Sequence, residues 1–581
     1  MKRLLSNLNL RIQSLSRLER WLAALLVIGV MAPWALAIAF PMNLGWDASI
    51  GVKVWQSMQQ GAAFNCLRLA SRSDVGLARD VFVSTFSPGH YLLPGLLGLT
   101  RLRLGTSLAI LTLMCIGGGL YGYYILYTRF LGFSRLVGLI SLAVILCSWN
   151  TLVNFVQYSG GTLLVFGALP WFLMACLVCL RKGGALHLLL PPIFLAGAFL
   201  KLSFAVVGLC VVILPLTHAI LNKKPWFCWR NASPAAAFAL FYALLYAGYT
   251  SHGWNPVERS GVEVTLSGGV FAFAYSLAAT ASSAISAFLL LSRIGLALPF
   301  ALEPASAMWS SLGPAQYSLV LLLGVFGAVL IWIAFTSVKD LLYRSLFAAT
   351  IVVHATVMTA LCWAGGVGFE DRHFWPAGSL LLPGLIHWIA HQRSNHRRAT
   401  LAAILVPFAA YGLRVYLSGL QLRVAAPRSI VLGISVPDVD RLVVQKLEAF
   451  DAETQPRILW LGHPVPSVLA TRTPLILDIH IPRTLRRGVI PLEQGPFRGQ
   501  VERAMAIIQP SDLQRGESPS AFLAAKFPDM AGPWTCKPAG RCHPALFARI
   551  DQRCSSGTAV PVTPSCAGGT PTSKCQPGPT P

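Results

Sequence analysis

The sequence predicts a polytopic α-helical membrane protein that ends in a small α/β domain. Of its 581 residues, 55% are hydrophobic and 12% are charged, and the mean hydropathy is +0.61. A soluble protein of this length would carry about 25% charged residues. A bilayer accommodates the apolar surplus, because lipid faces such side chains directly. The surplus ends near Gln421, and the residues that follow have an ordinary soluble composition.

Apolar runs predict the membrane spans. Each run is close to the ~20 residues that a helix needs to cross, or is short enough to need a thinned bilayer. Residues 264–302 are apolar enough for further passes, so that 11 and 13 spans both stay open. The eleven runs cover roughly residues 21–40, 105–128, 134–153, 162–180, 186–200, 203–221, 234–250, 317–336, 345–363, 374–390 and 400–418.

Positive charge predicts the orientation. The formal net charge is +24, and Lys and Arg gather in alternate gaps between the apolar runs. By the positive-inside rule, the basic N-terminus (1–20) is cytoplasmic, and the loop 41–104 and everything after residue 418 lie outside. The run 21–40 is an uncleaved first span, because no small-x-small cleavage site follows it. This distribution argues against a nucleic-acid partner, which would need a basic patch in the soluble part.

The C-terminal region predicts an outer α/β domain over residues 421–552. Ser429–Val436 and Arg457–Leu461 are short apolar runs bounded by turn residues, which is typical of buried strands. Pro437–Phe450 has the pattern of a helix with proline at its start. The tail 553–581 is rich in Pro, Gly, Ser and Thr, and we expect it to be disordered.

The 13 cysteines fall into two main groups. Those in or beside the spans are expected to be small packing residues: Cys115, Cys147, Cys176, Cys179, Cys210, Cys228 and Cys362. Those of the outer tail suggest disulfides in an oxidising compartment: Cys536, Cys542, Cys554, Cys566 and Cys575. Their number is odd, so one is free or pairs elsewhere, for example with Cys66. A zinc site is the alternative, although no CxxC pair is present.

Asp47 is the first candidate for chemistry. It follows the outer end of the first span, beside Trp46. A carboxylate at this depth can act as a general base or hold a cation. The alternative is a solvated aspartate that caps the helix expected over residues 48–60.

A second polar group lies where the outer loop returns to the membrane. Arg79 and Asp80 precede Pro88 and Pro94, which break regular structure around His90 and Tyr91. A histidine at headgroup depth can titrate or bind phosphate. The alternative is that His90 and Tyr91 only anchor the chain at the interface.

Two cations complete the candidates. Lys201 interrupts two apolar runs on the outer side, where it can pair with an anionic headgroup or snorkel to the interface. Arg372 stands outside against the charge bias, so its guanidinium can clamp a phosphate or pair with Glu370 or Asp371. The sequence contains no Walker loop, Rossmann fingerprint, HExxH or GxSxG motif.

In this order, the motifs resemble the GT-C superfamily of membrane glycosyltransferases, nearest to its aminoarabinose and protein mannosyltransferase-like branch. Asp47 to Gly61 resembles the opening of the first outer loop in that branch. Arg79–Phe82 with Ser87–Tyr91, Leu200–Lys201, and Arg372–Pro376 with Pro383 resemble its later motifs, and residues 457–480 resemble its outer domain. The likeness covers most of residues 20–480.

The resemblance implies a function and a location. A GT-C-like protein of a bacterial inner (plasma) membrane would move a sugar from a polyprenyl-phosphate donor to a lipid, glycan or protein acceptor at the outer face. Asp47 would be the catalytic base, and Lys201 and Arg372 would hold the donor phosphate. Arg79, Asp80, His90, Tyr91, Glu370 and Asp371 are possible accessory residues. The alternatives are a transporter or flippase of a lipid-linked saccharide, and a membrane scaffold.

The sequence departs from the family pattern in three places, which weaken a metal-dependent mechanism and leave open a divergent or inactive member. Ala48 stands where the family often has a second acid after Asp47, the paired prolines are reduced to Pro88-Gly89, and Gln157–Gly161 holds no acidic residue. A divalent cation is therefore possible but not required by the motifs.

Overall fold

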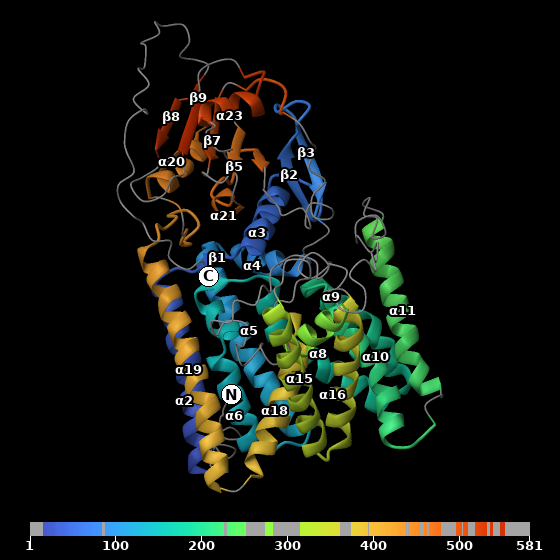
Figure 1. The fold of residues 1–581 in the computed structure, drawn as a ribbon. Coiled ribbons are helices and arrows are strands. Elements are labelled where there is room, and N and C mark those ends of the chain that lie inside the picture. The colour runs from blue at the N-terminus through green and yellow to red at the C-terminus, as the bar shows by residue number, and fades with distance from the viewer. Residues whose placement is uncertain are drawn as a thin grey trace, which may run out of the picture.

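The computed structural model describes residues 16–83, 87–225, 229–250, 273–282, 314–360, 373–392, 394–436, 439, 441–453, 458–461, 464–477, 496–501, 503–508, 518–530, 535–538 and 546–551. In this part of the chain, a bundle of helices carries an α/β unit on one end (Figure 1). We call this end of the bundle the sheet side.

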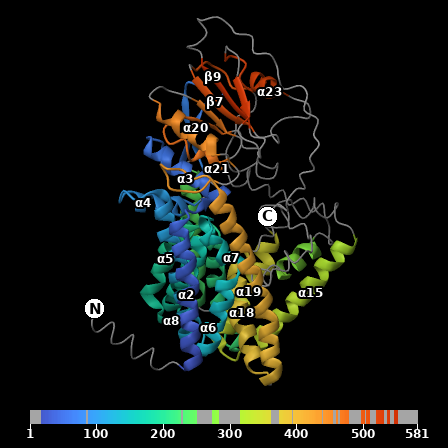
Figure 2. The same cartoon turned by 90° about the vertical axis from the view of Figure 1, so that its left-hand side faces the viewer.

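The bundle consists mainly of long apolar helices, which Figures 1 and 2 show from two directions. Their bounds are α2 Arg17–Ala39, α5 Leu104–Ile125, α6 Arg135–Cys147, α8 Gly161–Lys182, α9 Leu190–Leu200, α10 Phe204–Leu221, α11 Trp229–Thr250, α15 Pro314–Ser337, α16 Leu341–Val353, α18 Trp375–Ala390 and α19 Ser394–Ala425. Shorter helical segments are α7 Trp149–Leu152, η1 Leu126–Phe130, η2 Val153–Phe155, η3 Gly184–Leu189 and η5 His354–Met358.

Each of the eleven predicted spans coincides with helix over its described residues, and the chain is a multi-pass membrane protein. Six helices of the described residues are both long and apolar enough to cross, and a seventh span arises if the pair Arg135–Cys147 and Trp149–Phe155, bent by 63°, is counted as one. The other predicted spans coincide with helices outside this set. Of the ambiguous region 264–302, only 273–282 is described, and it is helical.

Local capping explains where several helices begin and end. Ser16 and Glu19 form a reciprocal capping box at the start of α2, in which the Ser16 N–H donates to Glu19 Oε2 (2.7 Å). Asp340 caps α16 by accepting from the Tyr343 N–H (2.8 Å). Helix α8 ends with Arg181 and Lys182, whose charges complement the helix dipole, before Gly183 at φ +66°.

Helices α5 and α8 cross at close range because a glycine on each helix lies against the other helix. A Cβ on Gly119 would lie 2.9 Å from a Phe166 atom, and one on Gly167 would lie 2.8 Å from Cys115 Cα. The neighbouring Gly117 and Gly118 have open space around the Cβ position among the described residues. Close packing by this glycine run therefore rests on Gly119.

A seven-stranded mixed sheet combines the first loop with the C-terminal region. Its order is β3-β2-β6-β5-β7-β9-β8, and β2, β6, β5 and β7 run parallel. The register places Leu69 of β2 opposite Leu475 of β6. The bounds are β2 Cys66–Ala70, β3 Ala78–Phe82, β5 Ile458–Leu461, β6 Leu475–Leu477, β7 Arg503–Ile508, β8 Thr535–Pro538 and β9 Leu546–Asp551, with helices α20 Arg441–Ala452, α21 Pro464–Ser467 and α23 Pro519–Lys526.

Within this unit, strand β5 confirms the run predicted at Arg457–Leu461, but the strand predicted at Ser429–Val436 is wrong. That segment is a turn closed by a single bridge between Arg428 and Ser435. Gly433 takes φ +66°, and Ser429 Oγ accepts from the Leu432 N–H (3.0 Å), so local turn chemistry prevails over the apolar pattern. The helix predicted from Pro437 begins at Arg441.

Three short elements connect bundle and sheet: β1 Asn43–Leu44, α3 Trp46–Gln59 and α4 Gly89–Gly98. Helix α4 lies across the sheet side of the bundle (Figure 2). Strand β1 pairs in parallel with β4 Gln157–Tyr158. The Arg79–Phe82 segment, expected near the return to the membrane, is instead the edge strand β3 of the sheet.

Among the described cysteines, Cys66, Cys115, Cys147, Cys176, Cys179 and Cys210 form no disulfide. Cys66 is buried on β2, and burial raises the pKa of its thiol, with Asp80 adding to the effect. The tail cysteines other than Cys536, as well as Cys228 and Cys362, lie outside the described residues. The tail disulfides therefore stay predictions.

Candidate functional site

Asp47 is held where two distant segments of the chain pair. The Asn43 N–H donates to Val156 O (3.3 Å), and the Gly45 N–H donates to Tyr158 O (2.9 Å). Helix α3 then begins at Trp46 with Gly45 as its N-cap, which places Asp47 in the first helical turn. The expected cap role therefore belongs to Gly45. The partly exposed carboxylate of Asp47 lies at the positive end of the α3 dipole.

His90 lies buried beside this turn, with 3% of its surface exposed. A Cβ on Gly51 would lie 2.1 Å from His90 Nε2, and one on Gly160 would lie 3.3 Å from His90 Cδ2. The His90 carbonyl accepts from the Tyr158 hydroxyl (2.5 Å). Glycine at these two positions leaves the space that the ring occupies.

The environment of His90 shows that two predicted site residues approach it. Burial lowers the pKa of His90 to about 4; the Asp47 carboxylate opposes this shift, and the Lys201 ammonium adds to it. Both charges therefore act on the same imidazole. Residues from α3, α4 and the end of α9 converge on this ring.

Lys201 is fixed against the start of α8. Its N–H caps α9 by donating to Gly197 O (2.9 Å), and its Nζ donates to Thr162 Oγ1 (3.2 Å). Its side chain packs on Gly161, where a Cβ would lie 3.1 Å from Lys201 Cδ. Helix α8 begins at Gly161 without a side-chain cap. The ammonium and the positive end of a 22-residue helix thus adjoin.

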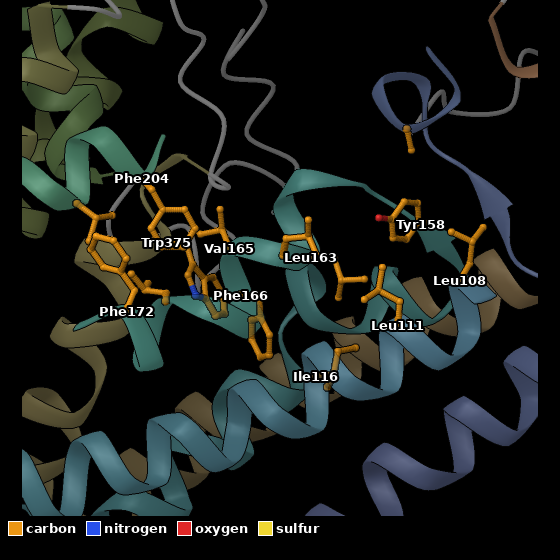
Figure 3. Packing of buried hydrophobic residues seen from close by; sticks show 14 of the residues in the cluster. Leu108, Leu111, Ile116, Tyr158, Leu163, Val165, Phe166, Phe172, Phe204 and Trp375 are labelled. Atoms are coloured by element: carbon orange, nitrogen blue, oxygen red, sulfur yellow. The ribbon is translucent and has the colours of Figure 1, made fainter. Parts of the chain in front are cut away.

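A small pocket with a volume of about 10 Å³ lies next to Thr162, between α8 and the start of α18. Figure 3 shows Trp375, Val165 and Phe166 in this packing region. The Trp375 and Phe166 rings are 5.2 Å apart, and Trp375 Nε1 donates to the Tyr123 hydroxyl (2.7 Å). The pocket is lined by Asn150, Thr162, Val165, Phe166 and Trp375. Thr162 belongs to both the pocket and the Lys201 contact, so the cation stands at the edge of this cavity.

Asp80 has its contacts away from this spot, whereas the Tyr91 ring packs edge-on against the His90 ring, with the ring centroids 5.4 Å apart. Asp80 on β3 pairs with Arg68 Nε on β2 (3.0 Å) and accepts from the Ala63 N–H (2.9 Å). Arg79 lies beside it on the same edge strand. Tyr91 is 1% exposed, and its hydroxyl donates to Asn65 Oδ1 (2.5 Å). These contacts hold the first loop together.

Glu370, Asp371 and Arg372 lie outside the described residues. Trp375, three positions after Arg372, lines the pocket beside Thr162. Within the described ranges, no group of three or more His, Cys, Asp or Glu side chains could hold a metal. A divalent cation therefore stays an expectation from the resemblance.

Sequence reasoning missed Thr162, Asn150 and the pair Gly160-Gly161. Gly160 takes φ +63° and ψ −122°, a conformation that favours glycine strongly. A double glycine directly before an apolar run was the available signal, because it allows both the turn into α8 and the approach of Lys201.

The chain is similar to solved structures of ArnT from Cupriavidus metallidurans. With the apo structure, the identity is 13%, the TM-score is 0.49, and the alignment covers 93% of this chain and 99% of that one. With ArnT bound to undecaprenyl phosphate, the identity is 12%, the TM-score is 0.45, and the alignment covers 91% of this chain and 97% of that one. With arabinofuranosyltransferase AftD from Mycobacteria, the identity is 14%, the TM-score is 0.42, and the alignment covers 92% of this chain and 40% of that one.

No protein-family model matches the sequence, and the comparison with curated proteins gives no match.

Proposed function

We propose that this protein is a membrane glycosyltransferase that moves a sugar from a polyprenyl-phosphate donor to an envelope acceptor at the outer face. The observation that carries the proposal is the convergence of Asp47 and Lys201 on the buried ring of His90, beside the pocket at Thr162. A base and a cation at the end of an apolar bundle suit a substrate with its chain in lipid and its phosphate at the interface.

Lys201 and the first turn of α8 would bind the donor phosphate. The ammonium donates to Thr162 within this turn, and an anion at a helix N-terminus is stabilised by the aligned peptide dipoles. The same groups stabilise the charge that develops on the phosphate as it leaves. Arg372 would add a second cation from the segment that precedes Trp375.

Asp47 would act as the general base. The acceptor hydroxyl oxygen attacks the anomeric carbon of the sugar, the bond from that carbon to the phosphate oxygen breaks, and the hydroxyl proton passes to the carboxylate. The sugar joins the acceptor, and polyprenyl phosphate leaves with the electron pair. His90, with its pKa lowered to about 4 by burial, stays neutral at pH 7 and leaves this proton to Asp47.

The charge pattern supports the outer face as the location of the site. The loop with Asp47 and the C-terminal region share one sheet, so both lie on the same side of the membrane as this sheet. The positive-inside rule assigns that side to the exterior, because the N-terminus before α2 is basic.

Substitution Asp47→Asn tests the proposal. Membranes are incubated with a radiolabelled sugar linked to undecaprenyl phosphate, the lipid that is bound in one of the similar ArnT structures. The measurement is the amount of radiolabel that is released from this lipid. Loss of the base should lower transfer by about 10²–10⁴-fold. Asp529→Asn is the matched control, because Asp529 pairs with the exposed Arg498 in the C-terminal region. Unchanged transfer in Asp47→Asn would refute the assignment.

Transport of a lipid-linked saccharide is the second candidate, and His354 is the residue that bears on it. It is 2% exposed within the bundle, with Nδ1 2.8 Å from Thr350 O. These contacts favour a packed histidine over a polar path. The same labelled donor separates the two functions, since a flippase moves the intact lipid-linked sugar between leaflets without releasing label.

A further inference from the structure

Helix α3 is held on two opposite faces. Asp47 and Gly51, four residues apart, lie on the face toward His90. Lys53, Gln56 and Gln60 follow at spacings of three and four and form the other face. Gly51 and Lys53 are about 200° apart around the helix. This second face, which we call the polar face of α3, contacts residues 468–471 of the C-terminal region.

The polar face is built from buried donors. Lys53 is 2% exposed, and its Nζ donates to Ala470 O. Gln56 Nε2 donates to Val468 O (2.8 Å), and Gln60 Nε2 donates to Thr471 O. Burial lowers the pKa of Lys53 to about 7, while the Asp451 carboxylate opposes this effect. A buried lysine is unfavourable without partners, so the site is specifically organised around it.

Asp451, near the end of α20, fixes the acceptor loop. Its carboxylate accepts from the backbone N–H of Thr471 (2.7 Å), Arg472 (2.9 Å) and Thr473 (2.8 Å). It also accepts from the hydroxyls of Thr471 (2.7 Å) and Thr473 (2.9 Å). Burial acts to raise the pKa of Asp451, but these hydrogen bonds outweigh it and lower the pKa below its usual value. The loop is thus a rigid acceptor for Lys53.

Strand pairing joins the acceptor loop back to the segment that follows α3. Beyond this loop, Leu475 of β6 pairs with Leu69 of β2, and β2 follows α3 in sequence. Toward its N-terminal end, α3 cannot move closer to α4, because even a Cβ on Gly51 would overlap His90. A rotation of α3 that breaks the Lys53 contact therefore also moves Asp47.

We propose that the loop 468–473 sets the position of Asp47 through Lys53, which acts as a positioning residue for the proposed transfer. The expected effect on catalysis rests on the proposed function, whereas the positioning of Asp47 by Lys53 does not depend on it. Lys53 lies six residues from Asp47 on one rigid helix, about 9 Å along the axis. Misplacement of a reacting group by about 1 Å can cost 10²-fold in rate.

Variants Lys53→Met and Gln56→Met in the full-length chain test the proposal by two measurements. Hydrogen–deuterium exchange of the purified protein in detergent follows the amides of residues 46–52, and transfer kinetics follow kcat and the donor KM. Arg472→Met is the matched control, because Arg472 is exposed and bonds Asp451 only through its backbone N–H in the described contacts.

In both test variants, we expect exchange over residues 46–52 to rise by about threefold or more. We expect kcat to fall by about tenfold to hundredfold, with the donor KM changed less than about twofold. Arg472→Met should resemble the wild type in both measurements. If Lys53→Met does not fold, Gln56→Met decides the question.

Wild-type exchange over residues 46–52 in the folded variants would overturn the proposal, as would raised exchange with unchanged kcat. If the wild-type protein transfers no sugar, the proposed function fails. In that case raised exchange at the Asp47 end of α3 still supports positioning by Lys53, and unchanged exchange overturns it.

Discussion

Gly51 of α3 lies against the imidazole of His90: a Cβ at Gly51 would be 2.1 Å from His90 Nε2 and 2.7 Å from Cδ2. The ring of His90 is buried and is bounded on another side by Gly160. The approach of α3 to α4, and with it the place of Asp47, depends on the missing side chain at Gly51.

Substitution Gly51→Ala should therefore destabilise the protein by about 1–3 kcal/mol, because the added methyl group overpacks the site. Thermal unfolding in detergent measures this loss. Gly117→Ala in α5 is the matched control, since the Cβ position there is open and alanine favours a helix by about 0.5–1 kcal/mol. Equal unfolding temperatures for the two variants would contradict the packing at His90. The double variant Gly51→Ala with His90→Ala should recover part of the loss.

The lowered pKa of His90 predicts that the free energy of unfolding decreases in acid. Burial lowers its pKa from 6.5 to about 4, so the folded state disfavours the charged ring. The stabilisation is fully present above pH 6.5 and is lost as the pH falls toward 4, by about 3 kcal/mol in total. We expect the stability difference between wild type and His90→Gln to shrink over this window. Unfolding in detergent at pH 4–8 measures it.

The charged groups that act on His90, Asp47 and Lys201, are present in both proteins of this comparison. His391→Gln, at an exposed position at the end of α18, serves as the control substitution. A wild-type minus His90→Gln difference that is flat between pH 4 and 6.5 would contradict the neutral, buried state of His90.

The sequence predicted those features that depend on local pattern. Apolar runs mark the long helices of the described bundle because a span is decided by its own ~20 residues. Asp47, His90 and Lys201 stood out as candidates because polar residues are rare among apolar neighbours. The pairing of Leu69 with Leu475 was not predictable, since strands so far apart in sequence meet only after the whole fold forms.

The polar face of α3 illustrates the same limit. Lys53, Gln56 and Gln60 have the spacing of a solvated face on an amphipathic helix. In the structure, they are covered by the loop at Ala470, which lies more than 400 positions further along the chain. Amphipathic pattern alone cannot distinguish contact with water from contact with buried carbonyl groups.

Lys53 gives a pH dependence at the alkaline end. Burial lowers its pKa from 10.5 to about 7, with Asp451 opposing, so the folded state binds fewer protons than the unfolded state between these values. This contribution to stability is greatest above pH 10.5 and falls as the pH drops toward 7. Lys53→Met should therefore gain relative to wild type as the pH falls from 10 to 7. Unfolding midpoints across that range test this, and Arg472→Met should show no such trend.

Arg423 joins the two segments that precede the paired strands β1 and β4. The side chain is 1% exposed near the end of α19, with Nη1 donating to Phe155 O (2.6 Å) and Nη2 to Leu36 O (3.1 Å). One planar guanidinium thus holds the last turns of η2 and α2 at a fixed separation. Asn43 and Gln157, whose strands bring Asp47 toward Gly160, follow directly from these turns.

We expect Arg423→Met to lower stability by about 2–3 kcal/mol, because buried carbonyl groups lose charged donors. Arg423→Lys should recover only part of this, since a single ammonium cannot replace a fork that reaches two carbonyls. Arg414→Met, at an exposed position on the same helix, is the control and should change stability by less than about 0.5 kcal/mol. Similar losses at both positions in detergent unfolding would mean that α19 tolerates no methionine there. A loss specific to Arg423 would show that its guanidinium couples α2 to η2. Transfer should then fall together with stability, because strands β1 and β4, which lie beside Asp47, follow these turns in the chain.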